Sequence, residues 1–445
     1  MNKLVETYNK RVSLAEKIYK TTHEGEAMSD GKKLLLATML NNTNRFLTES
    51  FNNSVGTQRA DLGMYKRFCL NLINVAVPTL IAPELVITHP MTSITGVIAY
   101  VKYTLGSNKG GVKQGDVVAD PFHLEKMTED RINYTGSAVV EEVTVASGKV
   151  MLSWTPIWEG FKPEIVGASS GETITVTDAK TGECAVTGAT GKIKVKYCYD
   201  NVIIPQNDLP ILNAEMASIG LVAKARRIAV YYSQIAAFQA KQDYGFSLED
   251  QLAEKACGEL SYEIDTEVVS LLDKLAGEAG AETTFNERVP YGISMEQHFE
   301  SFMRIIEKAK QLVYDRTQKF APNYMVCSSS VATILPFLRG WKAASLGKIN
   351  GPYLAGTLNG LKVFVSPALV AGRFFLGVNG DDMMSSAAVY APYMPIVPTQ
   401  LLGYADGANS KGFSTMYALE PLNKLLVVAG KVVDEERVVT TKTTA

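Results

Sequence analysis

Residues 247–278 read SLEDQLAEKACGELSYEIDTEVVSLLDKLAGE, and this stretch predicts one long helix. Ser247 suits the N-cap, and from Leu248 to Leu275 only the tolerated Gly258 interrupts the pattern. The helix would contain about 28 residues and span roughly 42 Å at about 1.5 Å per residue. Apolar residues recur at every fourth position, so the stripe winds around the helix and meets different neighbours at its two ends. We therefore predict a spine helix rather than a member of one bundle.

The segments on either side of this helix have other patterns. Residues 137–200 contain short stretches of alternating apolar and polar residues punctuated by glycines, which predicts a small antiparallel β insertion. Residues 281–445 alternate between strand-like stretches and an amphipathic helix over 295–313, and residues 1–50 read as helical. The whole chain is therefore expected to be α+β.

The composition excludes several classes of protein. Among 445 residues, Lys+Arg number 44 and Asp+Glu 46, for a net charge of -2, and 46% of residues are hydrophobic. This chain is too apolar to be disordered, and its balanced charge does not fit a bulk nucleic-acid or membrane binder. No segment reaches the roughly 18 apolar residues of a membrane helix, and residues 1–20 lack the apolar core of a signal peptide. We therefore expect the chain to be made in a cytoplasm-like compartment.

No catalytic or metal-binding motif is found in the sequence. The stretch Gly188–Lys192 departs from the phosphate-loop spacing, and neither HExxH nor GxSxG occurs. The five cysteines are scattered and odd in number, which argues against a disulfide framework or a zinc site. Cys184 and Cys198 of the insertion could face each other, although buried free thiols are favoured. The four histidines lie in unrelated contexts, so we expect no cofactor and no metal. They are His23, His89, His123 and His298.

Charge is unevenly distributed along the chain. Residues 248–278 carry nine carboxylates against two lysines, a net charge of -7, whereas residues 224–241 carry four basic residues and no acid. Carboxylates one turn apart could act as an acid/base pair, but a solvated face is the commoner meaning. The basic residues could be snorkelling side chains at a strand edge, or they could pair with the acidic helix of a neighbouring subunit. The candidate intersubunit charge contacts are Arg226, Arg227, Glu263, Asp265 and Glu267.

Several motifs, in the same order, resemble the major capsid protein of T-even-type tailed bacteriophages, which has the HK97-like fold. The resemblance covers roughly residues 64–440, without the insertion, and the first 50 residues also depart from the family pattern. The matching stretches are NVAVPTLIAPELVITHPM (74–91), KARRIAVYYS (224–233), EIDTEVV (263–269), NYMVCSSSVATIL (323–335), YAPYMP (390–395) and GFSTMY (412–417).

The resemblance implies a division of the chain into the parts of a capsid subunit. These are an N-terminal segment (1–49), an N-terminal arm with the first peripheral strand (50–102), an extended loop (103–205) carrying the insertion (137–200), a peripheral domain (206–280) with the spine helix (247–276), an axial domain (281–400), and return strands to the peripheral domain (401–445).

The resemblance also implies a function and partners. The chain would be a non-enzymatic shell protein that self-assembles into hexamers, forming the icosahedral or prolate head around double-stranded DNA. Expected partners are a vertex protein, a portal, a scaffold, a prohead protease and decoration proteins, with pentamers made by this chain or by a paralogue. An acidic spine facing the interior would repel packaged DNA and let it slide. The chain would be synthesised and assembled in the bacterial host cytoplasm and would end in the virion.

The same family implies removal of an N-terminal peptide after a tripeptide of the form [LI]xE. Leu47-Thr48-Glu49 fits that form, and so does Leu14-Ala15-Glu16. Two other classes remain open: a different self-assembling protein, such as a tail component or an encapsulin-type nanocompartment shell, and an enzyme with a β accessory domain. The absence of a nucleophile–base pair counts against the enzyme.

Overall fold

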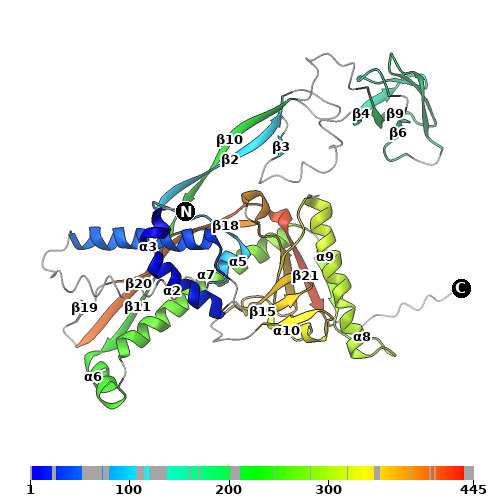
Figure 1. The fold of residues 1–445 in the computed structure, drawn as a ribbon. Coiled ribbons are helices and arrows are strands. Elements are labelled where there is room, and N and C mark those ends of the chain that lie inside the picture. Colours follow the sequence, from blue (N-terminus) through cyan, green and yellow to red (C-terminus); the bar gives the residue numbers. More distant parts are fainter. Residues whose placement is uncertain are drawn as a thin grey trace. The chain divides into compact units, whose positions relative to one another are not determined.

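A computed structural model describes most of the chain. The described residues are 3–22, 27–52, 73, 80–106, 115, 117–119, 138–158, 160, 162–168, 171–200, 211–245, 247–280, 282–317, 319–344, 351–380, 382–399, 402–404 and 407–434. Cys69, His23, His123 and most of the predicted extended loop between 107 and 137 lie outside this set. The chain forms two compact units, one from residues 1–98 and 219–445 and the other from residues 99–218 (Figure 1).

The first unit begins with helices that have a core of their own. They are α1 (Lys3–Thr7), α2 (Asn9–Thr22) and α3 (Asp30–Asn52). Buried residues from α2 and α3, including Ala15, Leu36 and Leu40, pack together with Ile73. The helix-like character expected for residues 1–50 is confirmed in the described part.

A mixed sheet supports the spine helix. Its strand order is β1-β18-β20-β11, with β19 also paired to β20. Along β11, residues with even numbers face one side, and Ile228 and Val230 pack there against Ala253, Ala256 and Leu260 of the spine helix. The strands are β1 (Ile87–Thr88), β11 (Lys224–Ser233), β18 (Ala388–Pro398), β19 (Leu402–Gly403) and β20 (Ala408–Pro421).

The spine helix α7 spans Leu248–Glu278, close to the predicted 247–276. The side chain of Ser247 caps it by accepting a hydrogen bond from Asp250 N, as the sequence predicts. Its buried residues change side along its length, and its two halves pack against different strands. A shorter helix, α6 (Gln234–Asp243), directly continues β11, and another, α5 (Ala82–Leu85), contacts the middle of α7.

A second, seven-stranded sheet has the order β12-β21-β17-β13-β16-β15-β14. Helix α9 covers it, and Phe302 of that helix packs edge-on against Phe374 of β17 and beside Phe285 of β12. The elements are β12 (Glu282–Asn286), α8 (Met295–Glu300), α9 (Phe302–Thr317), β13 (Tyr324–Cys327), α10 (Ser329–Ala332), η3 (Leu335–Phe337), β14 (Trp341–Ala343), β15 (Tyr353–Leu358), β16 (Leu361–Val365), β17 (Arg373–Gly377), η4 (Met383–Ser385), η5 (Lys424–Leu426) and β21 (Val427–Val433).

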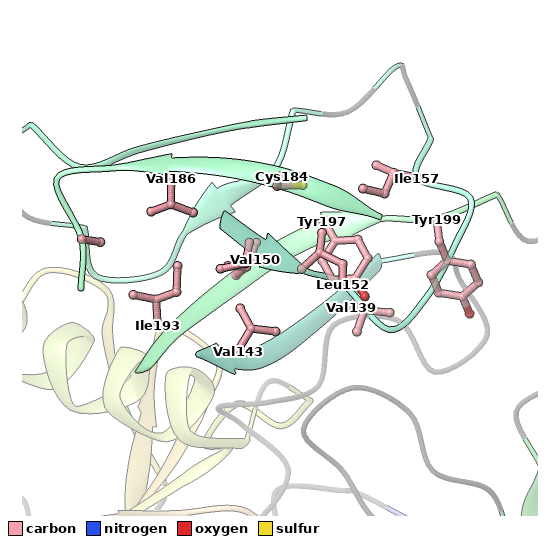
Figure 2. Packing of buried hydrophobic residues seen from close by; sticks show 12 residues of the cluster. Val139, Val143, Val150, Leu152, Ile157, Cys184, Val186, Ile193, Tyr197 and Tyr199 are labelled. Carbon is pink, nitrogen blue, oxygen red and sulfur yellow. The ribbon is translucent and has the colours of Figure 1, made fainter. Parts of the chain in front are cut away.

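The second unit contains extended strands and the β insertion. The strands β2 (Thr95–Leu105) and β10 (Leu212–Val222) carry the chain between the units and form a sheet with β3 (Val117–Ala119). The insertion has two three-stranded sheets, β4-β9-β6 and β5-β8-β7, whose side chains point toward one another around Val150 and Tyr197 (Figure 2). Its strands are β4 (Ala138–Val145), β5 (Lys149–Met151), β6 (Glu164–Ile165), β7 (Thr173–Asp178), β8 (Glu183–Thr187) and β9 (Gly191–Cys198).

The predicted α+β class is confirmed, and the spine helix, extended strands and β insertion expected of an HK97-like capsid subunit are present. The expected boundary at residue 400 does not coincide with a change of sheet. The strands on either side of it, β18 and β20, pair with each other, whereas the later strand β21 lies in the seven-stranded sheet between β12 and β17.

Candidate functional site: the charged contacts of the spine helix

A three-residue cluster joins the spine helix to its sheet. Arg226 on β11 faces α7, and its Nη2 donates to the carboxylate of Glu267 at 2.6 and 3.0 Å. Tyr417 on the neighbouring strand β20 donates its hydroxyl to the same carboxylate, and the Arg226 guanidinium lies 4.9 Å from the Tyr417 ring centre. Burial and then the bond to Glu267 raise the pKa of Tyr417, so its hydroxyl stays a donor. Arg226 and Glu267, predicted as intersubunit contacts, therefore pair within one chain.

Asp265 anchors the arm rather than a neighbouring subunit. It is 5% exposed, and its Oδ1 accepts hydrogen bonds from the backbone N–H groups of Ile81 at 3.0 Å and Ala82 at 2.9 Å. These are donors at the start of the short helix α5, which has no partner of its own for them. Burial raises the pKa of Asp265 to about 7. Because its carboxylate is buried inside the subunit, the expected role of Asp265 in an intersubunit contact is corrected.

The remaining carboxylates of α7 are mostly paired as well. Lys411 of β20 binds Glu249, and Arg373 of β17 binds Asp273 at 2.5 Å. Two further pairs lie along the helix itself, between Lys255 and Glu259 at 3.0 Å and between Lys274 and Glu278 at 3.9 Å. Within the described residues, Asp250, Glu254 and Glu263 are in no ion pair. Three cations from other strands therefore bring the net charge of this stretch from -7 to -4 in the fold.

Arg227 differs from its neighbour Arg226. It lies on the opposite face of β11, exposed, in register with Ser414 of β20. Among the described residues it has no ion pair. Of the five predicted charge contacts, Arg227 and Glu263 are the two that the fold leaves on the surface, and the intersubunit role stays a prediction for them.

A second polar cluster was missed in the sequence. The Glu84 side chain is 10% exposed and accepts hydrogen bonds from Tyr19 of α2 at 2.7 Å, from Lys362 of β16 at 3.2 Å, and from Lys32 of α3. Three separate parts of the chain thus converge on one carboxylate in the arm. No local sequence pattern predicts this cluster, because the partners of Glu84 are 52 or more residues away from it along the chain.

The predicted cleavage tripeptide lies in helix α3. Leu47 is buried against Met394 and Val397 of β18, and the Thr48 hydroxyl donates to Asn44 O at 2.7 Å. The side chain of Glu49 is outside the described set. Nearby, Asn42 donates to Met91 O at 2.7 Å and to Tyr393 O at 2.9 Å, which fastens α3 to the arm and to β18. The alternative, Leu14-Ala15-Glu16, lies within α2.

The described residues contain no group of three or more potential metal ligands. Cys184, Cys198, Cys257 and Cys327 are buried and form no disulfide, which confirms the favoured interpretation of Cys184 and Cys198 as buried thiols. Burial raises the pKa of both Cys257 and Cys327 to about 12, so these thiols are poor nucleophiles.

His298 is buried with its Nε2 2.7 Å from Asn286 O, and burial lowers the pKa of His89. None of the described helices is long and apolar enough to cross a membrane.

Comparison with known proteins points in one direction. The family model for the major capsid protein Gp23 matches residues 63–443. The chain is 21% identical over 397 residues to the major capsid protein of Vibrio phage KVP40, which covers 79% of this chain and 75% of that protein. It is 23% identical over 219 residues to the major capsid proteins of Enterobacteria phages T6 and T4, covering 44% of this chain and 44% and 42% of theirs.

Solved structures are similar at low identity. The capsid of Myoviridae phage XM1 matches with 10% identity and a TM-score of 0.34, covering 69% of this chain and 89% of that one. A structure from Mycobacterium phage Bobi matches with 13% identity and a TM-score of 0.37, covering 71% of this chain and 100% of that one.

Proposed function

Because the chain belongs to the Gp23 major capsid protein family, we propose a specific way in which its two units serve the shell. The protein is a structural, non-enzymatic subunit of a phage capsid, and its place is the virion shell. Our proposal adds that it forms hexameric capsomers enclosing double-stranded DNA, with pentamers supplied by this chain or by a paralogue.

The observation that carries this proposal is the bracing of the spine. Helix α7 is tied to β11 by Arg226, to β20 by Lys411 and to β17 by Arg373, so both sheets of the first unit are fixed to one helix. A shell subunit must carry load between neighbours without deforming, and a helix bonded to two sheets meets that need. In the described residues, β2 and β10 carry the chain between the two units, which suits a loop that extends over a neighbouring subunit.

Electron microscopy of the expressed full-length chain tests the proposal. We expect polyhedra or flat hexagonal sheets. Tubes would favour a tail component, and small monodisperse particles would favour an unrecognised enzyme. A second test is the Arg226→Glu variant. Loss of the ion pair with Glu267 should reduce the number of ordered assemblies while the protein is still expressed.

We further propose that the N-terminal helices are removed after Glu49 by a prohead protease, and that scaffold, portal and decoration proteins act in the same assembly in the host cytoplasm. The tripeptide Leu47-Thr48-Glu49 supports the cleavage proposal. Measuring the intact mass of the chain in particles tests it, since a full-length mass would contradict cleavage.

The ion pairs of α7 limit the acidic surface that this helix could present to packaged DNA. Asp250, Glu254, Glu263 and Asp265 of α7 lack an ion pair among the described residues. Asp265 is buried, so any repulsion of DNA by this helix would come mainly from the other three. We expect purified capsomers to bind no measurable DNA at about 0.15 M salt. Tight binding that weakens with salt would contradict this expectation.

A further inference from the structure

The sequence contains three Asn-Gly dipeptides, and the structure describes both residues of two of them. These two are Asn359-Gly360 and Asn379-Gly380, while Asn350 of the third lies outside the described residues. Glycine has no Cβ, so the peptide nitrogen that follows each asparagine is sterically open to the side-chain amide carbon. The two dipeptides have the same covalent chemistry, and their surroundings in the fold therefore decide which of them reacts.

Asn359 and Gly360 form the turn between β15 and β16. The residues that flank them, Leu358 and Leu361, pair with each other and are at most 1% exposed. Asn359 has a φ of 46° and Gly360 a φ of 85°, and positive φ at both positions is typical of a type I′ turn. Both turn residues are exposed, although their neighbours are buried. The dipeptide is thus presented to water at the tip of a hairpin.

Within the described residues, no hydrogen bond holds the side chain of Asn359. Its Oδ1 lies against Gly340, where an added Cβ would be only 2.1 Å away, so this contact is made with bare backbone. A Cβ built on Gly360 would meet no atom within 4 Å, so the space beside the Gly360 nitrogen is open to water. In this part of the chain the carboxamide of Asn359 can therefore rotate, and water can reach the nitrogen that would attack it.

Asn379 is held much more firmly than Asn359. Its Nδ2 donates to Glu84 O at 2.8 Å, and its backbone N–H donates to Asn323 Oδ1 at 2.9 Å. The backbone N–H of Gly380, whose nitrogen would attack, donates to Ser385 O at 3.0 Å. A Cβ built on Gly380 would lie 2.3 Å from Ser385 Oγ, so the space beside this nitrogen is filled. A reaction at Asn379 would have to break the hydrogen bonds of both the carboxamide and the attacking nitrogen.

We propose that Asn359 is a site of spontaneous deamidation in the folded chain and that the fold protects Asn379. The Gly360 nitrogen loses its proton to hydroxide and attacks Asn359 Cγ, which forms a cyclic imide. The bond between Cγ and Nδ2 breaks, and ammonia leaves after taking a proton from water. Water then opens the imide at either carbonyl and gives aspartate or isoaspartate. The net reaction consumes one water and releases one ammonia.

Formation of the imide requires Asn359 Cγ and the Gly360 nitrogen to come into contact, so the turn must first open locally. An exposed hairpin tip opens at little cost, because only the turn itself must rearrange. Isoaspartate routes the backbone through Cγ and so lengthens the turn. Because Leu358 and Leu361 pair directly beside it, the longer connection disturbs the end of the ladder between β15 and β16. Deamidation thus adds a negative charge to the turn and weakens the hairpin.

Peptide mass mapping of the purified full-length chain tests this proposal. The chain is incubated at mildly alkaline pH in heavy-oxygen water, folded in one sample and unfolded by urea in the other, and incorporated oxygen marks each conversion. We expect Asn359 to convert at least about ten-fold faster than Asn379 in the folded chain, and the two rates to agree within about three-fold in urea. Asn323→Ala removes a partner of Asn379, so it should raise the Asn379 rate and leave the Asn359 rate unchanged.

Equal rates at the two asparagines in the folded chain would overturn the proposal, and so would an Asn359 that reacts only in urea. A rate difference that persists at about ten-fold in urea would also contradict it, because the local sequence rather than the fold would then set the rates. Circular dichroism before and after the incubation confirms that the first sample stays folded. The test uses the dispersed subunit and needs no shell, so its result is independent of the proposed capsid function.

Discussion

Two neighbouring arginines of β11 have opposite surroundings. Arg226 makes two bonds to Glu267 under the ring of Tyr417, whereas Arg227 is exposed on the other face. We expect Arg226→Glu to place a second carboxylate against Glu267 and to lower the free energy of unfolding by about 1–3 kcal/mol, discounted for the partial exposure of the pair.

The matched variant Arg227→Glu should change the free energy of unfolding by less than about 0.5 kcal/mol and affect assembly only. Thermal unfolding of the dispersed subunit measures both. Equal destabilisation by the two variants would contradict the intrachain role of Arg226.

Asp265 makes a pH-dependent contribution with an unusual sign. Its pKa is raised to about 7 by burial, above the unfolded value of about 3.9, so the folded state binds the proton more tightly. Its contribution is therefore most favourable below about pH 4 and is lost as the pH rises through about 7, at about 1.4 kcal/mol per pKa unit. Asp265→Asn removes this titration, while an amide oxygen can still accept from Ile81 and Ala82.

We expect the Asp265→Asn variant to gain stability relative to wild type between pH 5 and pH 8. Urea unfolding at both pH values measures the gain, and the buried Tyr390 nearby stays neutral in this range because burial raises its pKa. Parallel stability curves for the two proteins would show that Asp265 does not titrate there.

At the scale of elements, helix α3 is held on β18 by one polar residue and one apolar contact. Asn42 donates to two backbone carbonyls, and Leu47, which lies two residues before Glu49, packs on Met394 and Val397. A protease binds an extended segment, so the end of α3 must unwind before cleavage. We expect a Glu-specific protease to cut slowly after Glu49 in the dispersed subunit and faster in Asn42→Ala, which loses about 1–3 kcal/mol of bonding to buried carbonyls.

Asn41→Ala is the control for this prediction, because it removes the same chemical group from the adjacent position of α3. Mass spectrometry of the fragments gives the cleavage rates. Rapid cleavage after Glu49 in the wild-type subunit would mean that α3 does not protect the tripeptide.

The elements that the sequence predicts well are those determined by local patterns. The bounds of α7 follow from Ser247 and an uninterrupted apolar repeat, and the insertion follows from alternation between glycines. Contacts between distant residues could not be predicted. Nothing near Glu84 indicates Lys32 or Lys362, and nothing near Asp265 indicates that its carboxylate is buried under Ile81. The net charge counted along α7 alone was a poor guide to its surface for the same reason, because Arg373 and Lys411, which pair with its carboxylates, come from other strands.

At the scale of the whole molecule, the insertion has the features of an independent folding unit. Its core cluster is drawn entirely from residues 139–199. At its centre the buried Tyr197 donates its hydroxyl to Glu141 at 2.8 Å and accepts from Trp154 N at 3.1 Å, while Trp154 stacks on Tyr199 with ring centres 5.2 Å apart. A core that needs no residue from elsewhere should fold without the rest of the chain.

We therefore expect residues 137–200, expressed alone, to unfold cooperatively. Tyr197→Phe should lower the free energy of unfolding by about 1–3 kcal/mol, because it leaves the half-buried backbone N–H of Trp154 without its acceptor and removes the hydroxyl that donates to Glu141. Thr175→Ala, on the exposed strand β7, is the control and should change stability little.

In the full chain, replacing 138–199 by a short glycine-serine linker should leave the unfolding of the first unit unchanged, as followed by near-UV circular dichroism. A shared loss of structure would show that the two units fold as one, and assembly of the shortened chain into shells would place the insertion outside the contacts that close the shell.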